Sequence, residues 1–185
     1  MRGIFTAALL VTASTGASAQ QAPVHQYGAL AIAPKGDRLA SIEAASPTHA
    51  AIVVRRVSDG GVAQTIDPCP TCSYGGPTFA ADGRIAFVAR KPGEPRALVM
   101  VADAGGARQV ATIDGIAQAP RFSPDGKRLA LLATFGAAKE AGATQAGVRQ
   151  VGEIGETSDE QRLAIVDIAA GTVKPVSPAD RYIYE

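Results

Sequence analysis

The apolar residues of this chain occur in short runs, and clusters of glycine, proline, aspartate and serine separate these runs. The stretch Leu98–Ala102 reads Leu-Val-Met-Val-Ala, and Leu129–Leu132 reads Leu-Ala-Leu-Leu. Short apolar runs that are bounded by turn residues indicate strands with one or both faces buried. The pattern predicts an all-β protein in which many short strands are joined by tight turns.

One turn motif occurs three times along the chain. It is clearest at residues 122–130, Phe-Ser-Pro-Asp-Gly-Lys-Arg-Leu-Ala, where Asp125 and Gly126 form the turn. Proline presets φ, aspartate caps the turn locally, and glycine adopts a positive φ without a Cβ clash, so the motif predicts a hairpin with a bulge at the glycine. The two related segments contain Gly36 in the first copy and the pair Asp82 and Gly83 in the second.

A second hairpin follows each copy of this motif. The first turn glycines lie at positions 36, 83 and 126, and those of the second hairpins at 61, 106 and 171. Two hairpins make four strands, and a period of about 40–50 residues is typical of the blades of a β-propeller. The sequence therefore predicts a partial β-propeller of about three four-stranded blades, in units at about residues 24–66, 77–113 and 120–176.

The first residues have the pattern of a secretory signal. Arg2 precedes an apolar stretch at residues 4–11, and Ala17-Ser18-Ala19 forms a small-residue cleavage site. The apolar stretch is much shorter than the roughly 20 residues that cross a membrane. We expect residues 1–19 to be a signal peptide and residues 20–185 to be an exported propeller portion. The expected location is periplasmic or secreted, with no membrane span after cleavage.

The charge balance excludes several classes of partner. The chain has 18 lysines and arginines against 17 aspartates and glutamates, which gives a net charge of +1. Nucleic-acid binding is not expected, because it requires a basic excess. The 46% content of hydrophobic residues is too high for a disordered chain. The sequence contains no phosphate-binding loop and no cluster of metal-ligand residues, so we expect no metal and no cofactor.

The segment at residues 122–130 resembles the repeat of TolB-like, WD40-like propellers. The same repeat builds the N-terminal propeller of the prolyl oligopeptidase family of serine peptidases, which includes dipeptidyl peptidase IV and acylaminoacyl peptidase relatives. Residues 151–156, 161–167 and 177–185 are similar to exported bacterial members of that family. The resemblance implies a propeller that binds short peptides and controls their access to a downstream α/β-hydrolase domain. The alternative is a TolB-like propeller that binds other proteins.

The chemistry of such a peptidase is missing from this chain. The sequence has no Gly-x-Ser-x-Gly nucleophile motif, and its two histidines, His25 and His49, both lie early. A Ser-His-Asp triad of the α/β-hydrolase type places its histidine last, so no triad is expected here. At about 45 residues per blade the chain holds too few blades to close a ring. We therefore expect an N-terminal part of a larger protein, and we expect residues 20–185 alone to associate or to remain partly unfolded.

The two cysteines form the sequence Cys69-Pro70-Thr71-Cys72. Zinc needs four ligands, and no second cysteine or histidine pair follows. A redox motif of the thioredoxin type opens a helix, whereas this one lies between a strand and the next repeat. In an exported protein a local disulfide is the preferred interpretation, and two free thiols are the alternative.

The third unit is longer than the second, and the additional residues lie between positions 135 and 161. This segment contains Glu153 and Glu156 among several acidic residues. Relatives of dipeptidyl peptidase IV use paired acidic side chains of the propeller to hold the amino terminus of the substrate, and the resemblance implies this role for Glu153 and Glu156. A carboxylate pair suits an ammonium group in charge and in hydrogen bonding. The alternative is a solvated acidic loop.

Overall fold

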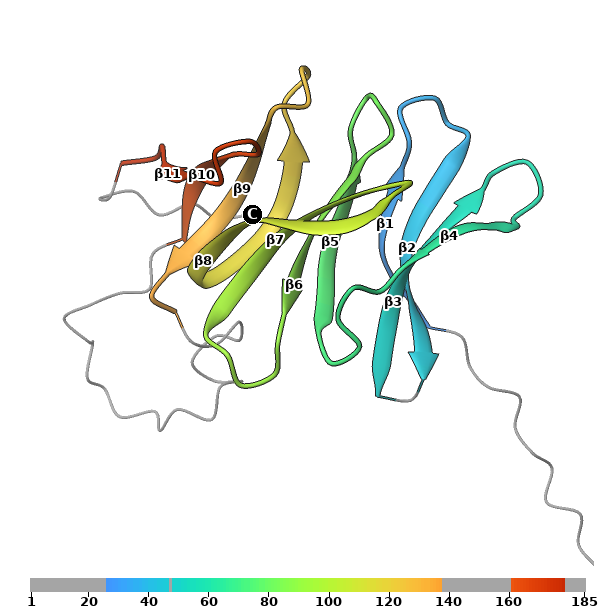
Figure 1. The fold of residues 1–185 in the computed structure, drawn as a ribbon, viewed down its shortest axis with the longest axis horizontal. Helices are drawn as coiled ribbons and strands as arrows, with labels where there is room; N and C mark the ends of the chain where they lie inside the picture. The colour runs from blue at the N-terminus through green and yellow to red at the C-terminus, as the bar shows by residue number, and fades with distance from the viewer. Residues whose placement is uncertain (1–25, 47, 138–160, 179–185) are drawn as a thin grey trace, which may run out of the picture.

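The computed structural model describes residues 26–46, 48–137 and 161–178, and these residues form strands and turns (Figure 1). The strands are β1 (Tyr27–Ile32), β2 (Arg38–Ser46), β3 (His49–Arg56), β4 (Val62–Ile66), β5 (Ser73–Phe79), β6 (Ile85–Arg90), β7 (Arg96–Asp103), β8 (Gly106–Phe122), β9 (Arg128–Phe135), β10 (Gln161–Asp167) and β11 (Val173–Pro175). The all-β prediction is confirmed. None of the described segments is a helix long and apolar enough to cross a membrane.

The strands build three antiparallel blades. Strands β1 to β4 form a four-stranded sheet in chain order, and β5 to β11 are hydrogen-bonded in one series. The long strand β8 pairs with β7 as far as Asp114 and with β9 from Gly115 onward. We therefore distinguish blade 1 (β1–β4), blade 2 (β5–β7 and β8 to Asp114) and blade 3 (β8 from Gly115, and β9–β11). They stand side by side in Figure 1, and the predicted partial propeller of four-stranded blades is confirmed.

Strand β8 changes blades at Gly115. This residue has a φ of +125°, and its N–H donates to the carbonyl of Pro95 at 2.9 Å. A Cβ at this position would lie 2.1 Å from the carbonyl oxygen of Thr134. Only glycine fits so close an approach of two backbones. The sequence predicted separate strands on the two sides of this position, whereas the glycine allows one strand to bend from one blade into the next.

Blade 2 is apolar on both faces. In β6 the side chain of Phe87 is fully buried in the cluster shared with blade 1, where it packs with Ile52. Its neighbour Val88 points the other way, into the cluster shared with blade 3, which includes Leu129 and Val166. Successive side chains of a strand point to opposite faces, so both faces of blade 2 are covered by a sheet.

The three repeat turns share one backbone geometry. Gly36, Gly83 and Gly126 have φ values of 70°, 90° and 67°. In blade 3 the N–H of Gly126 donates to the carbonyl of Ser123 at 2.8 Å, and the hydroxyl of Ser123 donates to Asp125 at 2.6 Å. That hydroxyl, together with the N–H of Lys127, holds the pKa of Asp125 below its usual range. Blade 2 has alanines where the motif has serine and proline, and its turn closes in the same way.

Each of these turns also carries a contact between blades, which we call the arginine clasp. The guanidinium carbon of Arg38 lies 5.5 Å from the ring centroid of Phe79, and that of Arg84 lies 5.5 Å from that of Phe122. In each case an arginine of one blade stacks on the phenylalanine of the next, as expected for a cation–π contact. Nη2 of Arg84 also donates to the carbonyl of Gly126 at 2.7 Å.

Two separate constraints require glycine at these turn positions. The turn needs a residue with positive φ, and the arginine of the clasp leaves no room for a side chain at Gly83 and Gly126. A Cβ on Gly83 would lie 2.6 Å from Nη2 of Arg38, and a Cβ on Gly126 would lie 2.6 Å from Nη2 of Arg84. A side chain at either position would displace the arginine from the ring below it. The turn residues of the repeat therefore join neighbouring blades rather than form a binding site.

Replacing Gly115 by alanine is expected to lower the free energy of unfolding by more than about 1 kcal/mol, because the residue needs a positive φ. The added Cβ would also collide with the carbonyl of Thr134. Urea unfolding followed by circular dichroism measures the loss. Gly28→Ala is the matched control, because nothing lies within 4 Å of a Cβ at Gly28. Equal stabilities of the two variants would contradict the role assigned to Gly115.

Candidate functional site

The first strand of each blade lies at a shared inner edge of the molecule, where β1 contacts β5 and β5 contacts β8. Each of these strands is interrupted by a residue with positive φ: Ala29 at 42°, Gly76 at 60° and Ala119 at 49°. All three lie seven residues before the turn glycine of their blade, so they occupy equivalent positions of the repeat. The strand pairing shifts register at each of them.

These three interruptions are β-bulges, and they were not anticipated from the sequence. A bulge leaves one residue outside the ladder and bends the strand. Two of them are followed directly by proline, at Pro77 and Pro120, which has no N–H to donate. The proline six residues before the turn glycine, present in the second and third copies, was the available signal. At each bulge the backbone at the inner edge leaves the regular pairing with the neighbouring strand.

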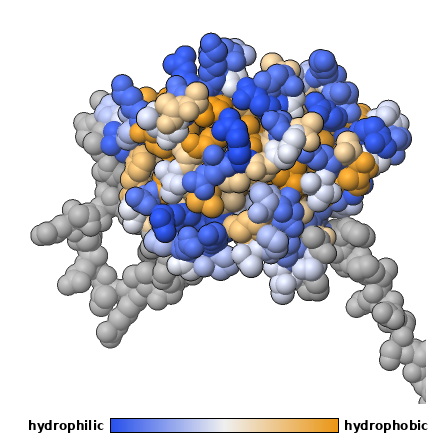
Figure 2. Space-filling model, in the orientation of Figure 1, coloured by the Kyte–Doolittle hydropathy of each residue, from blue (hydrophilic) through white to orange (hydrophobic). Residues whose placement is uncertain are grey.

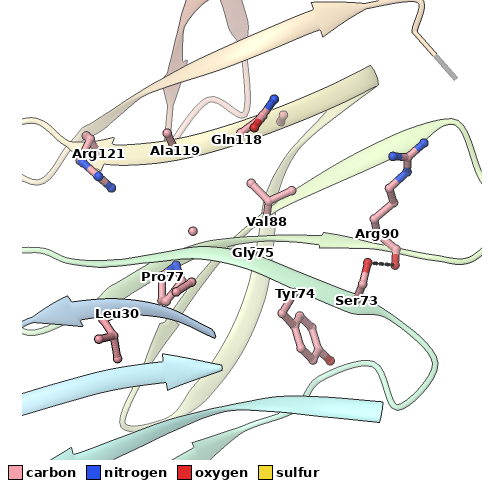
Figure 3. A pocket seen from close by; sticks show the side chains of 13 residues that line it. Leu30, Ser73, Tyr74, Gly75, Pro77, Val88, Arg90, Gln118, Ala119 and Arg121 are labelled. Carbon is pink, nitrogen blue, oxygen red and sulfur yellow. Dashed lines mark hydrogen bonds between the residues drawn. The ribbon is translucent and has the colours of Figure 1, made fainter. Parts of the chain in front are cut away.

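The bulged strands surround a hollow of about 610 Å³ (Figure 3). Its apolar wall includes Leu30, Pro77 and Val88, which come from three different strands. The polar side chains among the described lining residues are those of Ser73, Tyr74, Arg90, Gln118 and Arg121. In Figure 3 the side chains of Arg90 and Arg121 lie at opposite ends of the hollow. The site therefore combines apolar contact in its middle with a cation toward each end.

The charged side chains that the structure describes in the hollow are positive. Among the described residues, its lining contains two arginines and no aspartate or glutamate. Nη1 of Arg121 donates to the carbonyl of Pro120 at 3.0 Å, and Nε of Arg90 donates to that of Glu94 at 3.5 Å. A guanidinium offers five donors, and its planar geometry matches a carboxylate. The hollow is therefore suited to a short ligand that carries a carboxylate or several carbonyl groups.

The lining of the hollow holds no pair of groups for nucleophilic catalysis. The hydroxyl of Ser73 donates to the carbonyl of Arg90 at 3.4 Å, and no histidine is among the lining residues that the structure describes. A serine nucleophile needs an adjacent base. This arrangement of side chains can bind and orient a ligand.

The structure joins Cys69 and Cys72 by a disulfide, with the sulfur atoms 2.02 Å apart. The two cysteines lie in the connection between β4 and β5, which carries the chain from blade 1 to blade 2. The N–H of Cys72 also donates to the carbonyl of Cys69 at 2.9 Å. The disulfide closes a tight loop at the passage between two blades.

The hydroxyl of Tyr74 is hydrogen-bonded to this loop. It donates to the carboxylate of Asp67 at 2.8 Å and accepts the N–H of Cys69 at 2.8 Å. Nε2 of His49 lies 3.0 Å from the same carboxylate. Burial, together with the hydrogen bond to Asp67, raises the pKa of Tyr74 to about 12. No sequence motif indicated this cluster, because its members come from two blades and from the loop between them.

Of the other predicted site residues, those that the structure describes do not line the hollow. Glu153 and Glu156 lie outside the described residues, and so does the predicted signal peptide at residues 1–19. The repeat-turn residues Gly36, Asp82, Gly83, Asp125 and Gly126 lie in the turns that carry the clasps. Within the described ranges, no three His, Cys, Asp or Glu side chains come together in a way that would hold a metal ion.

The phenol of Tyr74 is expected to titrate late. The pKa of Tyr74 rises from 10.0 to about 12 on folding, so the unfolded chain releases this proton at lower pH. The stability due to the buried phenol is therefore complete below about pH 10 and is lost as the pH rises to about 12. Ultraviolet absorbance of phenolate measures the titration, and Tyr74→Phe should remove its late component. A Tyr74→Phe variant whose phenolate titration at high pH equals that of the unaltered chain would contradict this.

No family model matches this chain, and no curated protein matches it at a significant level. Solved structures do match it. TolB from Acinetobacter baumannii is 18% identical with a TM-score of 0.60 over 85% of this chain and 33% of that one. The β-propeller domain of the Trilobed protease from Pyrococcus furiosus is 13% identical with a TM-score of 0.56 over 84% of this chain and 44% of that one.

An acylaminoacyl peptidase from Pyrococcus horikoshii is 17% identical, with a TM-score of 0.55 over 82% of this chain and 26% of that one. This chain thus spans between about a quarter and less than half of these three proteins. Identities this low establish a common fold and nothing finer. The chain has the β-propeller fold of TolB and of the propeller domains of acylaminoacyl peptidase-type enzymes.

Proposed function

We propose that this chain contributes the substrate-binding blades of a propeller that admits short peptides to an exported serine peptidase. The observation that carries the proposal is the positively charged hollow of about 610 Å³ at the inner edge of the three blades. The acyl-transfer chemistry belongs to an α/β-hydrolase domain outside this chain, because the sequence has no Gly-x-Ser-x-Gly motif. The cleavage pattern at residues 17–19 supports export to the periplasm or the medium.

The dimensions and the lining of the hollow support a peptide ligand. Sites for small ligands usually enclose about 300–1,000 Å³ and combine apolar walls with a few polar groups. Leu30, Pro77 and Val88 offer apolar contact to side chains, and Gln118 offers both a donor and an acceptor to a peptide bond. Arg121 would bind the terminal carboxylate, because the side chain pairs with no carboxylate among the described residues.

The opposite end of the peptide needs an anionic partner. Glu153 and Glu156 remain the proposed anchors for its amino terminus, as the family resemblance implies. The alternative function is that of a TolB-like module which binds a folded protein partner. The hollow favours the peptide, because a space of about 610 Å³ holds a short chain and not a folded domain.

The proposal is tested by calorimetric binding of tetra-alanine with a free or an amidated carboxyl terminus. The free peptide should bind more tightly, and Arg121→Gln should weaken its binding about tenfold while changing little for the amide, because a charge-assisted hydrogen bond is lost. Arg96→Gln is the matched control, since Arg96 is exposed at the start of β7 and does not line the hollow.

Two results would overturn the proposed function. The first is the absence of saturable binding of either peptide at millimolar concentration, which would favour the protein-binding module. The second is equal loss of affinity in the Arg121 and Arg96 variants, because binding would then depend on overall charge and not on the hollow.

A further inference from the structure

Two adjacent glycines of β5 line the hollow, and the packing of the chain accounts for only one of them. Gly76 has a φ of 60°, and a Cβ on it would lie 2.7 Å from Cδ of Pro120. The φ of Gly75 lies outside the positive region, and nothing lies within 4 Å of a Cβ placed on this residue. Glycine in the interior of a strand weakens the strand. The open space at Gly75 is therefore not explained by contacts within the chain.

The repeat itself accepts a side chain at this position. Gly75 and Gln118 each lie eight residues before the turn glycine of their blade and directly before its bulge residue. Gln118 has a φ outside the positive region and lines the hollow with its side chain. Blade 2 thus has an empty space where blade 3 has a side chain. Gly28, the equivalent residue of blade 1, does not line the hollow.

The space at Gly75 has apolar walls. Gly75 pairs directly with Val88, so their side-chain positions lie on the same face of the sheet. Val88 belongs with Ala117 to the cluster shared by blades 2 and 3, and both residues line the hollow. Figure 3 shows Gly75 near the middle of the hollow, between Gln118 and Pro77. A ligand side chain that enters this space leaves water for apolar surroundings.

The same part of the hollow holds a cation. The approach of Gly76 to Pro120 brings β5 against β8, and Gly75 and Arg121 are the chain neighbours of these two residues. Arg121 is the proposed partner of the terminal carboxylate of a peptide. Successive residues of an extended peptide are about 3.3 Å apart. A peptide whose carboxylate reaches Arg121 therefore places its last side chains beside Gly75.

We propose that Gly75 is a specificity-determining residue of the hollow, and that the space beside it receives an apolar side chain from one of the last two residues of the bound peptide. This inference rests on the peptide binding proposed above and adds the class of peptide. The preferred ligands carry a free carboxylate and an apolar carboxyl-terminal end. A larger side chain in place of Gly75 would exclude them, because it would fill the space as Gln118 fills the equivalent position of blade 3.

Calorimetric binding of two tetrapeptides, Gly-Gly-Val-Val and Val-Val-Gly-Gly, tests the proposal. The two peptides have the same composition, the same charge and free termini, so they differ only in the end that carries the valines. The unaltered chain should bind Gly-Gly-Val-Val about tenfold more tightly, because burial of one valine side chain contributes free energy of that order.

Substitutions of Gly75 should remove this preference by filling the space. Gly75→Val should lower the ratio of the two affinities to about one, and Gly75→Ala should lower it to about three, because a methyl group fills part of the space. Gly28→Val is the matched control and should keep the tenfold preference. Gly28 has the same place in the repeat, has nothing within 4 Å of its Cβ position and lies outside the hollow.

Circular dichroism and urea unfolding verify that each variant is folded. Gly75→Ala should not lower the free energy of unfolding, because the added methyl group meets no atom of the chain. If the valine variant unfolds, the alanine variant decides the test.

Three results would overturn the inference and leave the proposed peptide binding intact. They are equal affinities of the two peptides for the unaltered chain, a preference that survives the substitutions of Gly75, and the same loss of preference in the Gly28 variant. Absence of saturable binding of both peptides to the unaltered chain would overturn the proposed function together with this inference.

Discussion

The sheets of this chain stack face to face because the strands of blade 2 carry apolar side chains on both sides. Phe87 and Val88 are adjacent in β6, point in opposite directions and are both buried. Burial of one such side chain contributes about 1.5–3 kcal/mol relative to exposure. An isolated hairpin is at best marginally stable in water. The hairpins of this repeat therefore depend on the blades before and after them, and the same requirement extends to the outer faces of blades 1 and 3.

Stacking also decides where a ligand can bind. Because each blade is rotated against the next, the first strands β1, β5 and β8 converge at one edge, and the bulges at Ala29 and Ala119 bend two of them there. The hollow at this edge draws Arg90 from blade 2 and Arg121 from blade 3. Close contacts fix the two connections between blades. The disulfide and the hydroxyl of Tyr74 do so between blades 1 and 2, and the close packing of Gly115 does so between blades 2 and 3. Apolar groups remain at the surface among hydrophilic ones in Figure 2, as expected where a sheet lacks a covering layer.

The peptide-binding site and the outer faces of the end blades are separate surfaces that one geometry links. Peptide binding depends on the side chains that line the inner edge. A further sheet against either outer face would add another first strand to the wall of the hollow. Completion of the ring would therefore enclose the ligand and strengthen its electrostatic contacts, because a charge pair interacts more strongly when water is excluded.

The sequence by itself determined the all-β class, the three repeats and the geometry of their turns. These features depend on the φ of a glycine such as Gly126, the ring of a proline and the alternation of apolar residues, all of which act over a few neighbouring positions. The tertiary structure decided that β8 is continuous through Gly115, that Arg84 lies over Phe122, and that Arg90 and Arg121 share a hollow. Such contacts join residues of different blades, and they exist only once the stacking of apolar faces has brought those blades together.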